Sequence, residues 1–162
     1  MALDRDAELP GAQLIASHHV ARGRNQAAGP WIRRAAALEE VHRAAQAERS
    51  RMAASDPVEP HRLSPVQARA LVKPFQGHPR VKRLYLVRKR LRHRADRDPA
   101  FAVAIVPRRP WWKPWDDARA RSLAAELASR LPAGPSLFLF VESRASRVLF
   151  RRARKIGADL LA

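Results

Sequence analysis

Hydrophobic and polar positions divide the chain into a first part without a steady period and a second part with clear helix and strand patterns. Over residues 1–30 no apolar spacing is sustained and glycines and prolines recur, which predicts a flexible, loosely ordered arm. From Trp31 to about Ala54 the chain is rich in Ala, Glu and Arg without internal Gly or Pro, which predicts a helix. Pro57 and Pro60 then favour an extended connector. The expected parts are an arm over 1–30, a helix with its linker over 31–56, and a domain over 57–162.

The second part alternates helix and strand patterns. Ser64-Pro65 is typical of a helix start, with Ser as the N-cap and Pro in the first turn. Strand patterns cover residues 81–91 and 100–106 with a polar turn between them, which predicts a hairpin with a strongly basic tip. Leucines at helical spacing follow Asp116 and Asp117, either of which can cap a helix.

Two further elements complete the pattern. Residues 137–141 are apolar at every position, which predicts a third strand at the centre of its sheet. A last helix is expected to start near Ser143 and to carry a stripe of arginines on its outer face. The resulting order is α-β-β-α-β-α, and the expected fold class is α/β (α+β), with a small sheet of about three strands and helices packed on it.

Composition restricts the class of protein. The 162 residues suit one compact domain with an appended segment, and they include no cysteine, which excludes disulfides, thiolate zinc sites and cysteine nucleophiles. The acidic start MALDRDAELP does not resemble an export signal, and the longest purely apolar run, Ala100 to Val106, is too short for a transmembrane segment. A soluble cytoplasmic protein is expected.

Charge is distributed very unevenly. Residues 57–162 hold 24 of the 32 Lys and Arg but only 8 of the 15 Asp and Glu, a local net charge of +16. A field of one sign favours an acidic partner. Coding bias toward Arg and Ala is an alternative explanation, but it does not account for the nearly neutral first third, which is just as rich in Ala.

Cations crowd the first strand, the hairpin tip and the last helix. Such residues can contact the phosphates of a nucleic acid, because arginine donates two hydrogen bonds at once and each contact releases counterions. The alternative is a solvated basic face. The candidate residues for nucleic-acid or acidic-partner binding are Lys82, Arg83, Arg88, Lys89, Arg90, Arg92, Arg94, Arg147, Arg151 and Arg154.

Three tryptophans interleaved with cations, Trp111, Trp112 and Trp115, are candidate aromatic contacts. They could stack on unpaired bases, anchor a protein partner, or lie at a membrane interface. They could also fold back over the sheet.

No arrangement of residues indicates catalysis. The sequence contains no phosphate-binding glycine loop, no nucleophile elbow and no zinc-ligand spacing, and turns or helix caps account for most carboxylates. Adjacent His18 and His19 are a weak signal without further ligands. We therefore expect no enzyme activity, no cofactor and no metal site.

Residues 63–162 resemble the C-terminal domain of the SseB family, the bacterial "enhanced serine sensitivity" proteins. The resemblance rests on the segments LVKPFQGHPRVKRLYLV, AFAVAIV, LPAGPSLFLFVES and KIGADLL. It implies a small α/β domain without an assigned catalytic centre, and it transfers no binding residue. The chain departs from the family in its basicity and in residues 1–60.

The sequence thus predicts a non-catalytic binding module of a small bacterial SseB-like protein whose basic surface contacts an acidic partner, with nucleic acid favoured through phosphate contacts. The alternative is a protein-interaction or assembly domain that binds a partner or a second copy through the Trp-rich loop and the helix over 31–54.

Overall fold

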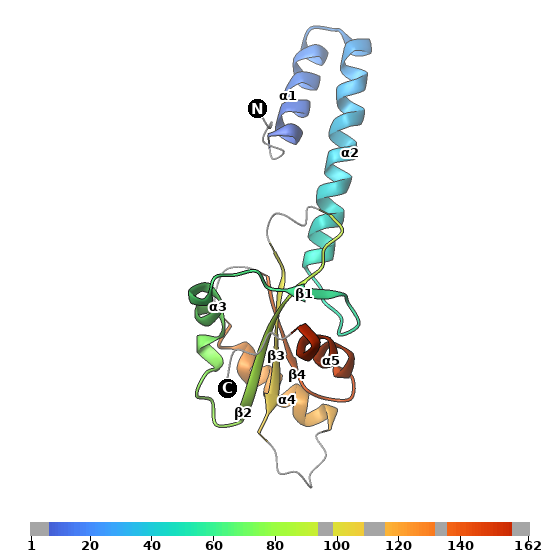
Figure 1. Cartoon of the computed structure of the whole chain (residues 1–162). Helices are drawn as coiled ribbons and strands as arrows, with labels where there is room; N and C mark the ends of the chain where they lie inside the picture. Colours follow the sequence, from blue (N-terminus) through green and yellow to red (C-terminus); the bar gives the residue numbers. More distant parts are fainter. Residues whose placement is uncertain (1–6, 94–98, 109–115, 132–135, 157–162) are drawn as a thin grey trace. The chain divides into compact units, whose positions relative to one another are not determined.

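The computed structural model of the chain describes residues 7–93, 99–108, 116–131 and 136–156. The chain divides into two units, Met1–Glu48 and Arg49–Ala162. Over the described ranges it contains five α-helices, one 3₁₀ turn and a four-stranded mixed sheet (Figure 1). The α+β class expected from the sequence is therefore confirmed. None of the helices in these ranges is long and apolar enough to cross a membrane.

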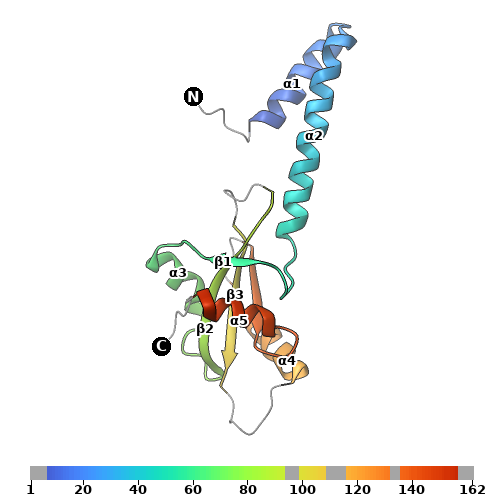
Figure 2. The ribbon, with the colours of Figure 1, turned by 45° about the vertical axis from the view of Figure 1, so that its right-hand side comes forward.

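The first unit is a helical hairpin, so the expectation of a loosely ordered arm is wrong for its described part. Helix α1 (Glu8–Ala21) and helix α2 (Asn25–Arg49) lie side by side (Figures 1 and 2). Pro10 falls in the first turn of α1, where its missing N–H costs nothing, and Gly23 adopts a φ of 68° in the turn that ends this helix. These residues therefore lie at the ends of helices and do not prevent helix formation. Pro30 lies inside α2, which begins earlier than expected.

The apolar side chains that the hairpin buries are small. They are alanines, among them Ala12, Ala28 and Ala35, and each buries little area. Between the helices, the Gln13 amide donates to the Glu39 carboxylate at 2.8 Å. The larger Leu14 stays 72 % exposed.

The second unit is built on a sheet with the strand order β1-β2-β3-β4. Its strands are β1 (Val58–Pro60), β2 (Val81–Lys89), β3 (Phe101–Pro107) and β4 (Leu137–Val141). β2 pairs antiparallel with β1 and β3, which confirms the expected hairpin, whereas β4 runs parallel to β3. The expected count of three strands is wrong, because the extended connector at Pro57 to Pro60 pairs with β2 and becomes β1.

Helices cover both faces of this sheet. Helix α3 (Pro65–Val72) begins at Ser64, whose hydroxyl accepts from the Gln67 amide in a capping box, and it continues into a 3₁₀ turn, η1 (Lys73–Phe75). Asp116, one of the two aspartates that the sequence offers as a cap, caps helix α4 (Asp117–Ala128) by accepting from the Arg119 backbone N–H at 2.7 Å. Helix α5 (Arg147–Ile156) lies on the opposite side of the sheet from α4 (Figure 2).

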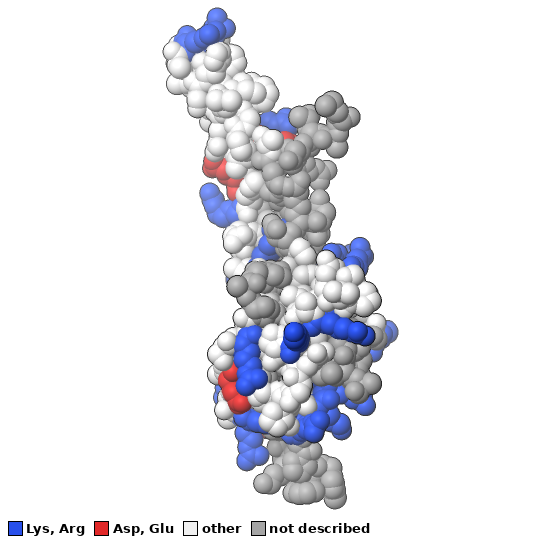
Figure 3. Space-filling view, turned by 90° about the vertical axis from the view of Figure 1, so that its left-hand side faces the viewer, with Lys and Arg blue, Asp and Glu red and all other residues white. Residues whose placement is uncertain are grey.

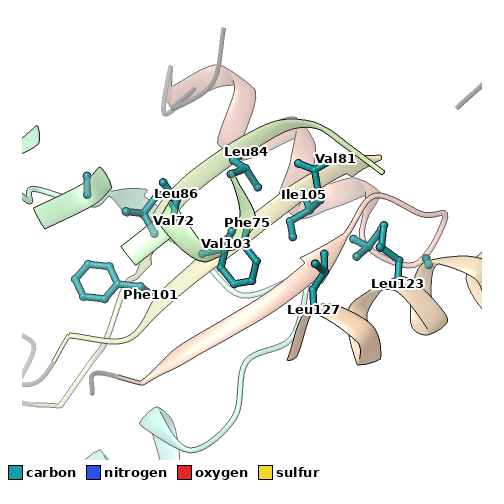
Figure 4. Packing of buried hydrophobic residues seen from close by; sticks show 13 residues of the cluster. Val72, Phe75, Val81, Leu84, Leu86, Phe101, Val103, Ile105, Leu123 and Leu127 are labelled. Carbon is teal, nitrogen blue, oxygen red and sulfur yellow. The ribbon is translucent and has the colours of Figure 1, made fainter. Parts of the chain in front are cut away.

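The alternation of side chains along β2 and β3 builds two cores. On the face covered by α3 and α4, here named the α4 face, Leu84 and Ile105 pack with Phe75 and Leu127 (Figure 4). The assignment of Leu84 and Tyr85 to opposite faces follows directly from the two-residue period of a strand. The smaller cluster on the other face, named the α5 face, comprises Tyr85, Val87, Ala102, Ala104, Leu149, Phe150 and Ala153.

Strand β4 lies at an edge of the sheet and not at its centre, contrary to the expectation. Its side chains contact both cores, with Leu139 on the α4 face and Phe138 and Phe140 on the α5 face. Because both faces of β4 contribute side chains to a core, although most of these side chains are only half-buried, an apolar sequence is compatible with an edge position. The composition of a strand therefore reports the burial of its faces and not the pairing of its edges.

Candidate polyanion-binding surface

Strand β2 runs from one end of the sheet to the other, and candidate cations lie near both ends of this strand. Val81 pairs with Pro107 and Ile105 with Val141, so β2 begins where β3 and β4 end. We name this end of the sheet the carboxyl edge. The other end of β2 pairs with β1, which contributes Glu59, and Asp56 lies just before β1.

At the β1 end of the strand, Arg88 is neutralised within the protein. It lies directly opposite Glu59 on the neighbouring strand, and its Nε donates to Glu59 Oε1 at 2.7 Å, with a second bond from Nη2. The two side chains are only 18 % and 23 % exposed. A half-buried arginine–carboxylate pair with two hydrogen bonds fixes the register of β1 on β2.

Lys89 is neutralised as well, and it is buried. Its Nζ lies 2.9 Å from Asp56 Oδ2 and donates to the Arg51 carbonyl oxygen at 2.8 Å. Burial raises the pKa of Asp56, but the hydrogen bonds from Lys89 and from the Ala53 amide, together with the Lys89 charge, outweigh that effect and lower the pKa overall. Lys89 therefore fastens the segment before β1 to the sheet.

Beyond the strand, the candidates of the hairpin tip are placed only in part. Arg90 is exposed, and its backbone N–H donates to the Pro57 carbonyl. Arg92 is exposed and already takes part in an interaction. Arg94 lies outside the described residues, as do Trp111, Trp112 and Trp115.

At the carboxyl edge, the two cations near the start of β2 are not neutralised by a described carboxylate. The pairing with β3 shifts by one residue between Val81 and Arg83, so Lys82 occupies a bulge. Lys82 and Arg83 are both exposed, and neither forms an ion pair with a described residue. Arg83 pairs with Val106, which packs against the second core, so Arg83 lies on the α5 face.

The turn between β4 and α5 brings further cations to this edge. Ser146 Oγ donates to the Val141 carbonyl at 2.7 Å and accepts from the Ser143 amide at 2.9 Å. Hydrogen bonds from Ser143 and from the Ala145 amide lower the pKa of Asp117, which therefore stays ionised beside the start of α5. The closed turn leaves Arg144 and Arg147 exposed.

Helix α5 extends this positive surface across the sheet. Leu149, Phe150 and Ala153 are buried, and the side of the helix opposite to them carries exposed cations at a spacing of four residues. Four residues of helix rise by about 6 Å, so the three cations form a line about 12 Å long. We name them the cationic row: Arg147, Arg151 and Lys155.

Two other arginines of α5 are structural. Arg154 pairs with Glu142; burial lowers its pKa, but the Glu142 charge and a hydrogen bond to Tyr85 raise it by more. Arg152 donates to the carbonyl oxygens of Ser55 and Asp56 at 2.7 and 2.8 Å. Of the three α5 candidates named from sequence, Arg147 and Arg151 are thus free of any ion pair with a described residue, while Arg154 is paired.

The described carboxylates of the second unit are all engaged within the protein. Asp56, Glu59, Glu126 and Glu142 form ion pairs, while Asp116 and Asp117 accept from backbone amides, Asp116 also pairing with Arg119. Glu126 holds Arg80 at 2.6 Å and the buried His78 at 3.1 Å. On the side of the molecule shown in Figure 3, Lys and Arg predominate over Asp and Glu. Within the described part of this unit, these carboxylates form no ion pair with Lys82, Arg83 or the cationic row.

Other chemistry is limited over the same residues. Burial lowers the pKa of His61, whose Nδ1 accepts from the Leu63 amide at 3.0 Å. Within the described ranges, no three His, Asp or Glu side chains are arranged to hold a metal ion.

Comparison of the chain with protein-family models, with curated proteins and with solved structures finds no match. The resemblance to the SseB family therefore stays a prediction.

Proximity along the chain groups ten cations but does not reveal which of them are paired. The partners of Arg88 and Lys89, Glu59 and Asp56, lie 29 and 33 positions earlier, and no local signal connects them. The helical period of four residues does identify the cationic row.

Proposed function

We propose that the unit Arg49–Ala162 is a non-catalytic module that binds nucleic acid through its phosphates. One observation carries the proposal. Among the described residues, the cationic row and its neighbours at the carboxyl edge are exposed and without a carboxylate partner, whereas the carboxylates of the unit are already engaged. This surface therefore keeps its charge for a ligand.

The geometry favours contacts with a phosphate backbone over contacts with bases. The cations of the row follow one another at about 6 Å, and they project from a helix whose buried side is fixed on the sheet. Contacts of this kind position a nucleic acid without reading its sequence. Binding should therefore weaken steeply with salt and discriminate little between sequences.

Fluorescence anisotropy of labelled single-stranded and duplex oligonucleotides, titrated at several salt concentrations, tests the proposal. The variant replaces Arg147, Arg151 and Lys155 together by Gln. Its control removes the same charge from exposed positions outside α5, by replacing Arg69, Lys73 and Arg130 by Gln.

We expect the row variant to bind with much lower affinity and to reduce the slope of log affinity against log salt by about 3, because each of its three cations is expected to neutralise one phosphate. The control should retain more affinity. Equally weak binding by both variants would mean that net charge alone attracts the ligand. Absence of binding by the unchanged protein near physiological salt would refute the proposal.

The helical hairpin supports the alternative function, binding of a protein partner. Leu14, Ile32 and Val41 are 72 %, 51 % and 41 % exposed, respectively. Replacing these three residues by Ser would abolish a complex of this kind and leave nucleic-acid binding unchanged.

A further inference from the structure

The two outer edges of the sheet differ in how they are protected from pairing with another strand. β1 has only three residues, ends in Pro60 and carries the charged Glu59, features that discourage the addition of a strand. β4 has five residues, all apolar, without proline and without a register shift against β3. No described segment pairs with its outer side. As far as the described residues show, the outer edge of β4 thus has none of these protections.

The backbone of β4 shows which groups face outward. Phe101 N–H donates to the Ser136 carbonyl at 2.8 Å, and Glu142 N–H donates to the Ile105 carbonyl at 2.9 Å. In a parallel ladder these bonds recur at every second residue, so the residues that bond to β3 are Phe138 and Phe140. The N–H and C=O groups of Leu137, Leu139 and Val141 therefore point away from the sheet.

The side chains at this edge are incompletely covered. Helix α5 lies over β1, β2 and β3, and Phe138 and Phe140 on the same face are only half-buried. An additional strand beside β4 would cover these two aromatic rings and would satisfy the outward backbone groups at the same time.

We propose that β4 pairs antiparallel with β4 of a second copy of this chain, about a two-fold axis at Leu139. In this register the outward-facing residues form hydrogen-bonded pairs, Leu139 with Leu139 and Leu137 with Val141 of the second copy. The Val141 carbonyl also accepts from Ser146, and its second lone pair is available to the new strand. Phe138 then lies opposite Phe140 of the second copy, a favourable cross-strand pair.

The second copy is the occupant that the sequence LFLFV favours, because the segment is nearly the same read in either direction. A two-fold axis perpendicular to the sheet keeps equivalent faces on the same side, so aromatic residues meet aromatic residues and aliphatic residues meet aliphatic ones. The strand itself carries no charge that would oppose its own copy. The two sheets would form one continuous sheet of eight strands.

The dimer does not depend on the proposed function, but it has a consequence for it. The two α5 helices would lie on the same face of the joined sheet, each with its cationic row directed outward. A dimer would therefore present two rows to one nucleic acid and bind it more tightly than either copy alone.

Disulfide trapping tests the register, since the chain has no cysteine of its own. A hydrogen-bonded antiparallel pair separates its Cα atoms by about 5.5 Å, within the range that a disulfide spans. Leu139→Cys should therefore form a covalent dimer under mild oxidation. Phe138→Cys should form little, because its counterpart is residue 140, and the exposed Val66→Cys on α3 measures random collision. Equal or faster cross-linking of either control would overturn the proposal.

Sedimentation equilibrium of the full chain at concentrations up to about 1 mM tests the dimer without cysteines. The interface is small, so association should be weak, and it should strengthen with salt as repulsion between two basic copies is screened. Phe138→Lys, with circular dichroism as the check of folding, should abolish it, whereas Val148→Lys on α5 should not. A monomer at every concentration and salt would overturn the inference. Nucleic-acid binding weakens with salt, so failure of one proposal is distinguishable from failure of the other.

Discussion

The two ends of strand β2 carry the same kinds of residue with opposite consequences. At the carboxyl edge, Lys82 and Arg83 are exposed and form no ion pair with a described residue. At the β1 end, Arg88 and Lys89 are bound by Glu59 and Asp56 and hold the segment around β1 to the sheet. A basic residue of this strand is thus either held in an ion pair or left exposed, according to the segment that lies beside it.

The largest effect should come from breaking the buried pair at the β1 end. Lys89→Met leaves Asp56 without its cation and should lower the free energy of unfolding by about 2 kcal/mol, less than for a fully buried pair because Asp56 is partly exposed. Urea denaturation measures this change in the free energy of unfolding. The neighbouring Arg90→Met, at an exposed position, should change it by at most about 0.5 kcal/mol. If both variants unfold alike, Lys89 does not fasten the segment.

The half-buried ion pair of Arg88 with Glu59, at the same end of β2, should contribute less to stability than the pair of Lys89 with Asp56. A double-mutant cycle of Glu59→Gln and Arg88→Gln should give an interaction free energy of about 1 kcal/mol, because solvent screens part of the attraction. Chemical denaturation of the four proteins measures the coupling. The exposed i,i+3 pair of Arg119 and Asp116 is the control and should give less. A coupling near zero at Glu59 would remove the distinction between the two ends of β2.

Ligand binding should show the reverse order of effects along β2. Arg83→Gln should weaken nucleic-acid binding several-fold and reduce the salt slope by about 1, without destabilising the protein. Arg88→Gln should leave the salt slope unchanged while lowering stability. Anisotropy titrations measure the affinity and salt slope of both variants, and chemical denaturation measures their stability. An equal reduction of the slope in Arg88→Gln would show that this residue also reaches the ligand.

The weakest effect is the response of the β1 end to acid. The pKa of Asp56 is lowered from its ordinary value of 3.8, so the ionised form is favoured in the folded state. Its contribution to stability is therefore complete above that value and disappears as the pH falls through the lowered pKa. Denaturation measured over the acid range should show a shallower decline in stability for Asp56→Asn than for the unchanged protein. A parallel pH profile for the two proteins would contradict this assignment.

The sequence was sufficient for those elements whose signals are local. Ser64 and Asp116 mark the helices that they cap, and the alternation of Leu84 with Tyr85 assigns the faces of β2. The sequence was insufficient for the first 30 residues. Pro10 and Gly23 are compatible both with an irregular segment and with the start and end of a helix, and the sequence alone does not distinguish these two cases.

Strand β1 and the edge position of β4 required the tertiary structure. A segment flanked by Pro57 and Pro60 becomes a strand only because β2 offers it an edge, and the pairing of Glu59 with Arg88 depends on that register. Similarly, LFLFV indicates burial of two faces and contains no information about the number of its neighbours.

The sequence by itself determined the charge of this protein, its strand and helix periods, and the line of cations along α5, because all three depend on composition or on spacing within one element. The tertiary structure alone decided which cations are neutralised within the protein and which stay exposed without an ion pair among the described residues. Neutralisation requires a carboxylate within a few ångströms, and the carboxylates that meet Arg88 and Lys89 reach them only through the pairing of β1 with β2.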